Sequence, residues 1–466
     1  MLPQALPYQL KVRDYFKQQA STWEFFAAAR TREEQLVSFQ TELLKNTYQF
    51  RRGTDTALYE KIDLVREKLE LGDLPITAYQ AQNANDPELN ASIVYLHREA
   101  HLVFSGPILE RLNEAELLAV IAHELTHVRL YTLLDGDLEV ADRIITALAN
   151  NYNSDPPYYE TARLFRLYTE IFCDRGAYAV LGDSGPVITL LVKLATGLSE
   201  VNAESYTLQA EAVFSAEPGT QSGMPTHPEN FIRARALKLW HEEQGAAAAI
   251  GDAGAPGSEG AGIPGSEGAR SAETKPGAEE AIVRMIEGKP ELDRLDLFSQ
   301  RELNELTALF LQEYLRPKWL QSTLVMGLVR EYFPGGLVVG RDMEPGRSAG
   351  AERGSGVARG FGGEHGSVGD EGGSGGAHRL IDTLTDAHPS IRDYFAYVLL
   401  DFVLADPSLE EMPAGRAFAF AGEMQLTAAY DAIYKKELQL SDKKWQQHKQ
   451  KVLEAYATAA KDQSIL

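Results

Sequence analysis

Hydrophobic positions follow a helical period over most of this chain. Apolar and aromatic residues recur at three- and four-residue steps through residues 8–70, which predicts three helices joined near residues 30–32 and 51–55. The period returns later and predicts helices over residues 113–134, 137–149, 158–181, 186–198 and 230–243. The chain is therefore expected to be mainly α.

One region breaks this helical period. From Leu74 onward, β-branched and aromatic residues come in short runs bounded by Asn, Asp, Pro and Gly, a pattern typical of strands. We expect strands near residues 77–81, 92–96 and 101–104, with the last two forming a hairpin. A small sheet among many helices indicates an α+β fold.

Two stretches rich in small residues divide the chain. Residues 245–278 carry a near-repeat of PGSEGA and few large apolar side chains, so they cannot bury enough surface to offset the entropy cost of ordering. We expect an N-terminal helical region over 1–73, a central domain over 74–244 and a flexible linker over 245–278. A C-terminal all-helical domain over 279–466 would be interrupted by a disordered Gly-rich loop at 335–378.

The C-terminal region offers three local signals. Ser299 and Glu302 have the spacing of a capping box, which predicts a helix start at Ser299. Residues 317–332 read as one helix. His388 precedes another helix, so we interpret it as a structural cap; the alternative is that it belongs to a functional site.

The most informative chemistry lies in the helix expected over 113–134. Asn113 and Glu116 have capping-box spacing at its start. His123 and His127 are four residues apart and share one helix face, so both imidazoles can bind one tetrahedral metal ion. Glu124 lies beside them, where it can polarise a water molecule without being a ligand. Because two histidines can take this spacing by chance, the interpretation needs a third ligand.

A third ligand is expected on the helix over 158–181. Its segment TEIFCDRGAYAV places Glu170 and Asp174 four residues apart on one face. Glu170 offers a carboxylate for the metal, and Asp174 can accept a hydrogen bond from the far nitrogen of a ligand histidine. The alternative is a solvated acidic pair, although buried carboxylates on so apolar a helix would need partners. We interpret Cys173 as a small buried residue rather than a thiolate.

These motifs together resemble a known family of peptidases. AVIAHELTHV (residues 119–128) and EIFCDRGAYAV (170–180) look like the paired motifs of peptidase family M48, the HtpX and CAAX-prenyl-protease type of gluzincin. PTHPENFIRARAL (225–237) resembles the family's T-H-P segment, and LNASIVYL (89–96) resembles its edge strand. The membrane helices of the HtpX and CAAX-protease branches are not recognised here, so their membrane substrates are not assumed.

The resemblance implies a zincin-like metallopeptidase domain with one Zn²⁺ ion. His123, His127 and Glu170 would ligate zinc, and Glu124 would be the general base. His227 would be a further catalytic residue near the open face of the site, where it would stabilise the oxyanion or, in a resting state, occupy the water position. Asp174 would hold a ligand histidine, and Arg233 would hold the segment that carries His227. An extended substrate would pair with the edge strand, whose residues are Ser92, Ile93, Val94, Tyr95 and Leu96.

Charge and cysteine content narrow the partners and the compartment. The chain has 45 Lys and Arg against 67 Asp and Glu, a net charge of −22, which disfavours nucleic acid and anionic membrane surfaces. Cys173 is the only cysteine, which fits a reducing compartment. The start of the chain does not resemble a secretory signal, and the longest apolar runs are too short for a bilayer span. We expect a cytoplasmic protein.

The expected function is zinc-dependent hydrolysis of peptide bonds through a metal-activated water, with a Glu general base and a protein or peptide as substrate. The alternative is a catalytically silent or latent zinc-binding scaffold whose C-terminal helical domain binds a partner protein. The intact catalytic positions favour the first, and the large helical regions without an assigned role favour the second.

Overall fold

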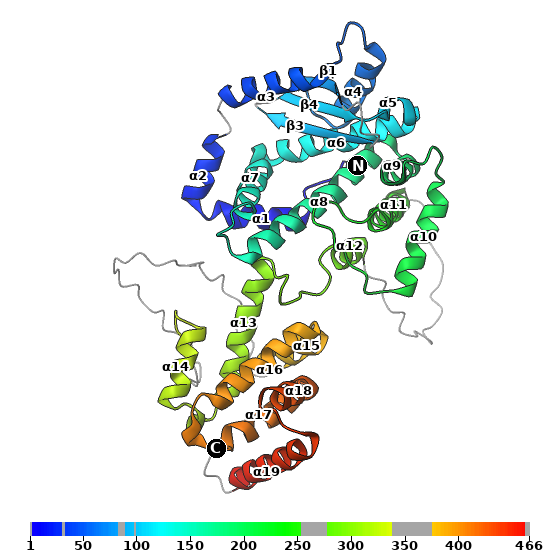
Figure 1. Ribbon diagram of the computed structural model, residues 1–466. Helices are drawn as coiled ribbons and strands as arrows, with labels where there is room; N and C mark the ends of the chain where they lie inside the picture. Colours follow the sequence, from blue (N-terminus) through cyan, green and yellow to red (C-terminus); the bar gives the residue numbers. More distant parts are fainter. Residues whose placement is uncertain are drawn as a thin grey trace, which may run out of the picture. The chain divides into compact units, whose positions relative to one another are not determined.

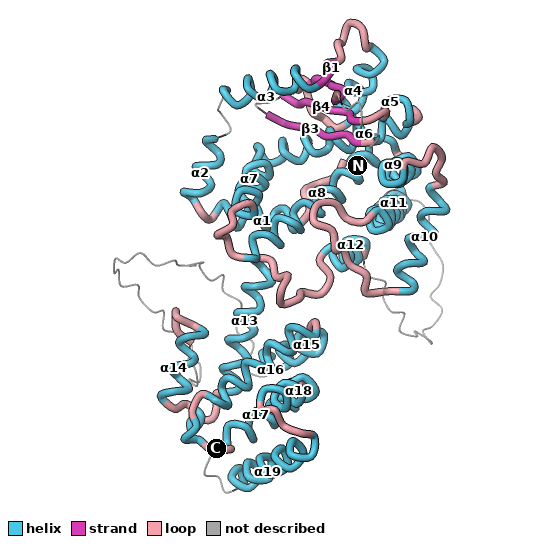
Figure 2. The backbone as a smooth tube through the Cα atoms, viewed as in Figure 1, coloured by secondary structure: helices cyan, strands magenta, loops and turns pink. Residues whose placement is uncertain are grey.

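The structure is a computed structural model, which describes residues 2–29, 33–82, 89–96, 99–252, 277–337 and 375–461 (Figure 1). Helices dominate the chain, and the strands gather in one small sheet (Figure 2). The α+β, mainly α fold class is confirmed. The linker and loop expected from the Gly-rich stretches lie mostly outside the described residues.

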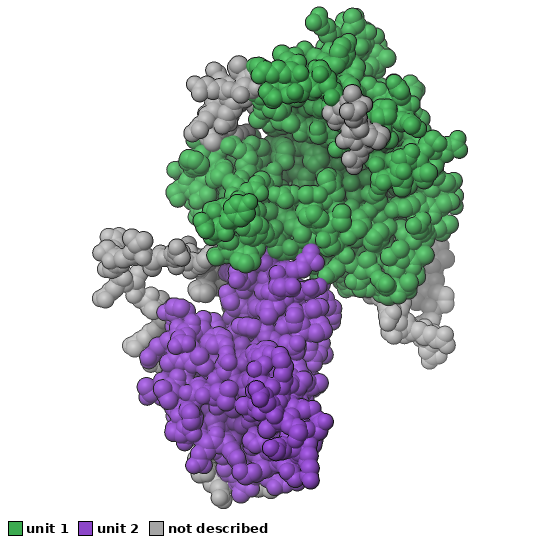
Figure 3. Space-filling view, in the orientation of Figure 1, with its two compact units in different colours: residues 1–288 green, residues 289–466 purple. Residues whose placement is uncertain are grey.

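The chain forms two compact units, unit 1 over 1–288 and unit 2 over 289–466 (Figure 3). Unit 1 contains α1 (Pro7–Lys17), α2 (Ala20–Ala29), α3 (Glu33–Asn46), β1 (Thr47–Gln49), α4 (Thr56–Lys68), β2 (Ile76–Ala81), β3 (Asn90–Leu96), β4 (Glu99–Ser105), α5 (Ile108–Arg111), α6 (Glu114–Thr132), α7 (Asp137–Ala149), α8 (Pro156–Leu181), α9 (Gly185–Thr196), α10 (Ala203–Ala216), α11 (Asn230–Asp252) and α12 (Ala278–Ile286). The C-terminal domain expected over 279–466 would include nearly all of α12. This helix belongs to unit 1 because it packs against α8 and α11.

The sheet has four strands in the order β1-β2-β4-β3. The three expected strands are present, and β3 and β4 form the expected antiparallel hairpin, with Leu96 opposite Glu99. Two features were not expected. β2 pairs with β4 in parallel, and the three-residue strand β1 adds to the far edge. This leaves β3 at the other edge.

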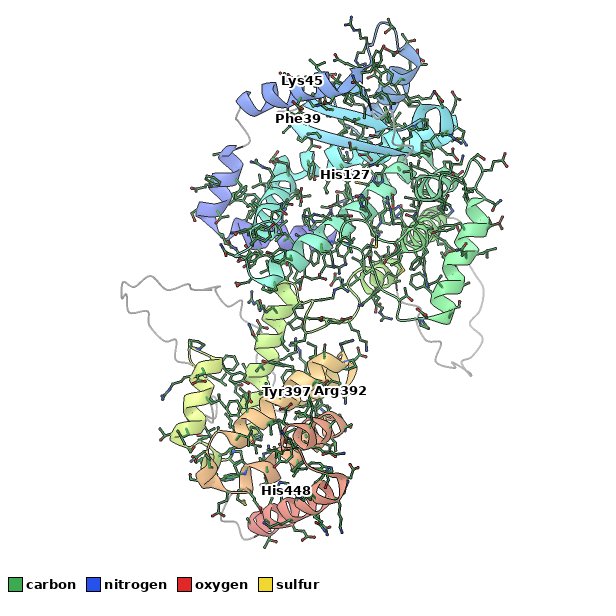
Figure 4. All side chains as sticks on the ribbon, viewed as in Figure 1. Phe39, Lys45, His127, Arg392, Tyr397 and His448 are labelled. Atoms are coloured by element: carbon green, nitrogen blue, oxygen red, sulfur yellow. The ribbon has the colours of Figure 1, made fainter. Side chains whose placement is uncertain are left out.

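The two faces of the sheet are covered by different helices. Ala78 of β2 and Leu102 of β4 are fully buried in one core with residues of α4 and α6. On the opposite face, the Phe39 ring of α3, labelled in Figure 4, lies edge-on to the buried His101 of β4, with 5.5 Å between the ring centroids. The sheet is thereby held between α3 and the helix that carries the H-E-x-x-H motif.

The first helix is anchored far along the chain. Gln9 of α1 is fully buried, and its Nε2 donates to Oγ1 of Thr169 on α8 over 3.2 Å. The Tyr8 ring stacks on Tyr168 with 5.1 Å between centroids. Since Thr169 directly precedes Glu170, α1 supports the part of α8 that carries the expected third ligand.

Unit 2 is all-helical in its described residues. It contains α13 (Leu297–Tyr314), α14 (Thr323–Tyr332), α15 (Gly375–Asp386), α16 (Pro389–Leu404), α17 (Met412–Glu423), α18 (Thr427–Glu437) and α19 (Asp442–Lys461). Aromatic rings fill its core, with 4.7 Å between the Phe310 and Phe395 centroids and 5.1 Å between those of Phe310 and Phe420.

Of the three local predictions for unit 2, two are wrong and one agrees with the structure. The helix start expected at Ser299 is wrong: Asp296 caps α13 by accepting from the Ser299 backbone N–H. The helix expected over 317–332 is broken, because Ser322 caps a separate α14. His388 does cap α16, and its Nδ1 accepts from the Ser390 N–H.

One described stretch, Glu114–Ala149, is long and apolar enough to cross a membrane by length and composition alone. It comprises α6, α7 and the kink between them, where Leu134 and Asp135 take positive φ angles. Of its most apolar window, 61% is buried inside the structure.

Candidate metal centre

The H-E-x-x-H motif lies on α6, as predicted. The Asn113 side chain accepts from the Glu116 N–H, and the Glu116 carboxylate accepts from the Asn113 N–H, so the predicted capping box is present. His127, labelled in Figure 4, and His123 occupy successive turns, with 5.3 Å between ring centroids. Both rings are directed to one side of α6, toward α8.

Glu170 on α8 meets both imidazoles. Its Oε2 lies 3.3 Å from Nε2 of His123, and its Oε1 lies 3.7 Å from Nε2 of His127. The side chain is nearly fully buried, and among the described residues Oε2 has no hydrogen bond of good geometry. Buried carboxylate oxygens rarely stay unsatisfied. Two imidazole nitrogens and an unsatisfied carboxylate oxygen are a donor set that suits a divalent metal ion such as zinc.

Asp174 and Arg233 contact the His123 and Glu170 side chains. Oδ1 of Asp174 lies 3.1 Å from Nδ1 of His123, on the opposite edge of the ring from Glu170. Arg233 of α11 donates two hydrogen bonds to Asp174, from Nε over 2.8 Å and from Nη2 over 2.7 Å. Its Nη2 also lies 3.3 Å from Glu170. The guanidinium of Arg233 thus contacts both carboxylates, and its role in holding the segment of His227 stays a prediction.

His227 reaches the same carboxylate from a different segment. Its Nε2 lies 3.6 Å from Oε1 of Glu170, and its side chain is 61% exposed. Nδ1 contacts the neighbouring Thr226 hydroxyl. Three imidazoles thus surround Glu170: His123 is buried, His127 is partly buried, and His227 lies at the solvent side.

Burial and charge move the pKa values of this cluster in opposite directions. Burial alone lowers the pKa of His123, but the adjacent carboxylates of Asp174 and Glu170 outweigh it and raise that pKa to about 10. Burial lowers the pKa of His127 to about 4 and raises the pKa of Glu124 to about 7. Burial would raise the pKa of Glu170, yet His123 and Arg233 hold it well below its usual range.

Cys173 is a neighbour of the cluster that sequence reasoning did not place there. It is fully buried, as predicted, but its Sγ and one ring nitrogen each of His123 and His127 all lie within 4.8 Å of one another. Burial and the charges of Glu170 and Glu124 raise the pKa of the thiol well above its usual value. The only sequence signal for this position is its place one turn after Glu170 on the same helix.

The expected substrate strand lies at the sheet edge. Residues Ser92, Ile93, Val94, Tyr95 and Leu96 belong to β3, which pairs with β4 on one side and packs near α6. An edge strand offers its other side to an extended chain.

Comparisons with known proteins find similarity to metallopeptidases. The model of peptidase family M48 matches residues 57–138, which include His123, Glu124 and His127 but end before Glu170. The plastoglobule-localized metallopeptidase 48 of Arabidopsis thaliana, a chloroplastic protein, is 25% identical over 159 residues, 31% of this chain and 46% of that protein. This chain therefore covers less than half of that relative's length. No solved structure matches the chain.

Proposed function

Since this chain belongs to the metallopeptidase family M48, we propose that it is a zinc-dependent endopeptidase that cleaves proteins or peptides. The observation that carries the proposal is the convergence of His123, His127 and Glu170 from two helices. Three protein ligands leave a fourth tetrahedral position for water or substrate, the arrangement of catalytic rather than structural zinc sites.

Glu124 is the proposed general base. His123, His127 and Glu170 would hold the zinc ion, which would supply Lewis-acid chemistry to polarise a peptide carbonyl and activate water near neutral pH. Glu124 takes a proton from the attacking water and returns it to the leaving amine, a task suited to a carboxylate with a pKa of about 7. His227, on the solvent side, donates a hydrogen bond to the negative charge that develops on the substrate oxygen.

Asp174 and Arg233 are proposed to orient the ligands. Asp174 accepts from Nδ1 of His123, which leaves Nε2 as the metal-binding atom. The guanidinium of Arg233 fixes Asp174 with two parallel hydrogen bonds and offsets the buried negative charge.

The substrate is proposed to bind as an added strand along β3. Backbone hydrogen bonds to the edge strand would hold any extended peptide, so recognition depends little on side chains. Unfolded proteins are therefore the substrate class to test first.

The test compares zinc content and cleavage of an unfolded protein between wild type and Glu124→Gln. The variant keeps all three ligands, so it should retain zinc and lose at least about a hundredfold in turnover. Glu114→Gln serves as a matched control, because Glu114 lies on the same helix with its side chain 90% exposed. Zinc-loaded Glu124→Gln with wild-type turnover would rule out the proposed base.

A latent or silent zinc-binding scaffold is the second candidate. The observation that favours latency is the His227 imidazole, 3.6 Å from Glu170, where it can occupy the position that water needs. A latent enzyme gains turnover in His227→Ala, whereas a silent scaffold has none in any variant.

A further inference from the structure

Two helices of the metal centre approach each other very closely at one point. A Cβ atom built on Gly176 of α8 would lie 2.2 Å from Oγ1 and 2.3 Å from Cγ2 of Thr126 on α6. Ordinary contacts of a Cβ atom lie at 3.4–4 Å. Both residues are buried, so no side chain fits at residue 176 unless something moves.

The Thr126 side chain cannot rotate to another rotamer at low energetic cost. Its hydroxyl donates to the Ala122 carbonyl over 2.6 Å, and the residue is fully buried. Rotation would break this hydrogen bond and drive the branched side chain into packed atoms. A methyl group added to Gly176 would therefore push the two helices apart by about 1 Å.

Space, rather than backbone conformation, explains the glycine. Gly176 lies within a 26-residue helix and does not take a positive φ angle. Glycine destabilises a helix interior relative to alanine, so alanine would be the better residue here if it fitted.

The contact lies between the metal-binding groups. Thr126 directly precedes His127, and Gly176 follows Asp174 by two residues. The site depends on short distances across this same helix pair, 3.3 Å from His123 to Glu170 and 3.1 Å from His123 to Asp174. A separation of about 1 Å would take the carboxylates out of reach of the imidazoles and of a shared metal ion.

We propose that Gly176 and Thr126 are positioning residues, which set the spacing of α6 and α8 so that one metal ion can be held by both helices. This inference rests on the proposed function, because it takes zinc to be the ion bound.

The test measures the zinc dissociation constant by competition with a chromophoric chelator, alongside thermal melting of each variant. Gly176→Ala should weaken zinc binding at least about tenfold. The swap Gly176→Ala with Thr126→Gly moves the bulk from one helix to the other and should return the affinity to within about threefold of wild type. Thr126→Ala with Gly176→Ala should rescue less, because Cβ of Thr126 would still lie 2.8 Å from the new methyl carbon.

Gly415→Ala is the matched control. Its Cβ would lie 2.4 Å from Cβ of Tyr456 in unit 2, so it creates a similar clash away from the metal-binding residues. It should lower the melting temperature without changing zinc affinity.

The outcomes separate this inference from the proposed function. If His123→Ala binds zinc as tightly as wild type does, the proposed function is contradicted. If zinc binding depends on His123 but Gly176→Ala has the zinc affinity of wild type, the spacing proposal is overturned and the proposed function is not. A swap variant that binds no better than Gly176→Ala, or that fails to fold, overturns the spacing proposal as well.

Discussion

Two sets of side chains offer three donor atoms for the proposed metal ion. Both include His123 and His127, and they differ in whether Glu170 or Cys173 is the third ligand. Glu170 lies within 3.7 Å of both imidazoles, while the Cys173 thiol belongs to a looser group spanning up to 4.8 Å. Carboxylates ionise readily at neutral pH, whereas burial raises the pKa of this thiol. The geometry and the ionisation both favour Glu170.

We predict that Cys173→Ser binds zinc with the affinity of wild type. Glu170→Gln should lose more zinc affinity than the roughly tenfold to hundredfold that is lost when a residue hydrogen-bonded to a ligand is removed. Cobalt substitution gives an independent measurement, because thiolate ligation adds a strong ultraviolet charge-transfer band. Such a band in wild type that disappears in Cys173→Ser would assign the sulfur as a ligand instead.

His123 couples metal binding to pH. Its pKa of about 10 means that the metal-free protein carries a proton on this imidazole at about pH 8, and zinc must displace that proton. Zinc affinity should therefore rise about tenfold per pH unit between about pH 7.5 and 9 and fall as the pH is lowered. Calorimetry in buffers of different ionisation enthalpy should find about one proton released. Binding heats that do not depend on the buffer would contradict this assignment.

At the scale of helices and strands, the sequence predicted the start of α6 and the three longer strands, because short-range signals determine them. Asn113 and Glu116 mark the start of α6 by their own spacing, and the β-branched runs mark β2, β3 and β4. The positions of His123 and His127 on one face need only the helical period.

Several missed features depend on distant residues, whereas two missed helix caps, Asp296 and Ser322, are local. The parallel pairing of β2 with β4 involves no local pattern, and β1 has only three residues. Arg233 binds Asp174 across 59 residues. The place of Cys173 in the cluster follows from how closely α6 and α8 approach, which the sequence of α8 alone does not specify.

The start of α6 rests on a buried ion pair. Nζ of Lys193 on α9 lies 2.8 Å from Glu116, and both side chains are less than a tenth exposed. Removing one partner leaves a buried charge uncompensated. We predict that Lys193→Met lowers the unfolding free energy of unit 1 by about 3–5 kcal/mol, measured by urea denaturation.

Lys61→Met is its control, because Lys61 pairs with the exposed Glu114 of the same helix turn and should cost about 0–1 kcal/mol. Equal losses in the two variants would contradict the burial argument.

At the scale of the whole molecule, two units with separate cores share one chain. All proposed zinc-binding residues belong to unit 1. Calorimetry of the full chain should show two unfolding transitions, and zinc at about a hundred times its dissociation constant should stabilise one of them by about 2.7 kcal/mol. A second transition that moves equally with zinc would show that the units unfold together.

The role of unit 2 and the cellular location stay predictions. The prediction that unit 2 binds a partner protein and the prediction of a cytoplasmic location come from the sequence alone. Affinity capture with residues 289–466 and cell fractionation address them separately.

The contact of α1 with α8 has a consequence for the newborn protein. Gln9 finds Thr169 only after 160 further residues have been made, which takes a ribosome about 8–30 seconds. Throughout that interval Gln9 and Tyr8 lack their partners on α8, which are Thr169 and Tyr168. A nascent chain that stalls before residue 168 therefore leaves this part of α1 without its α8 contacts, where chaperones can bind it.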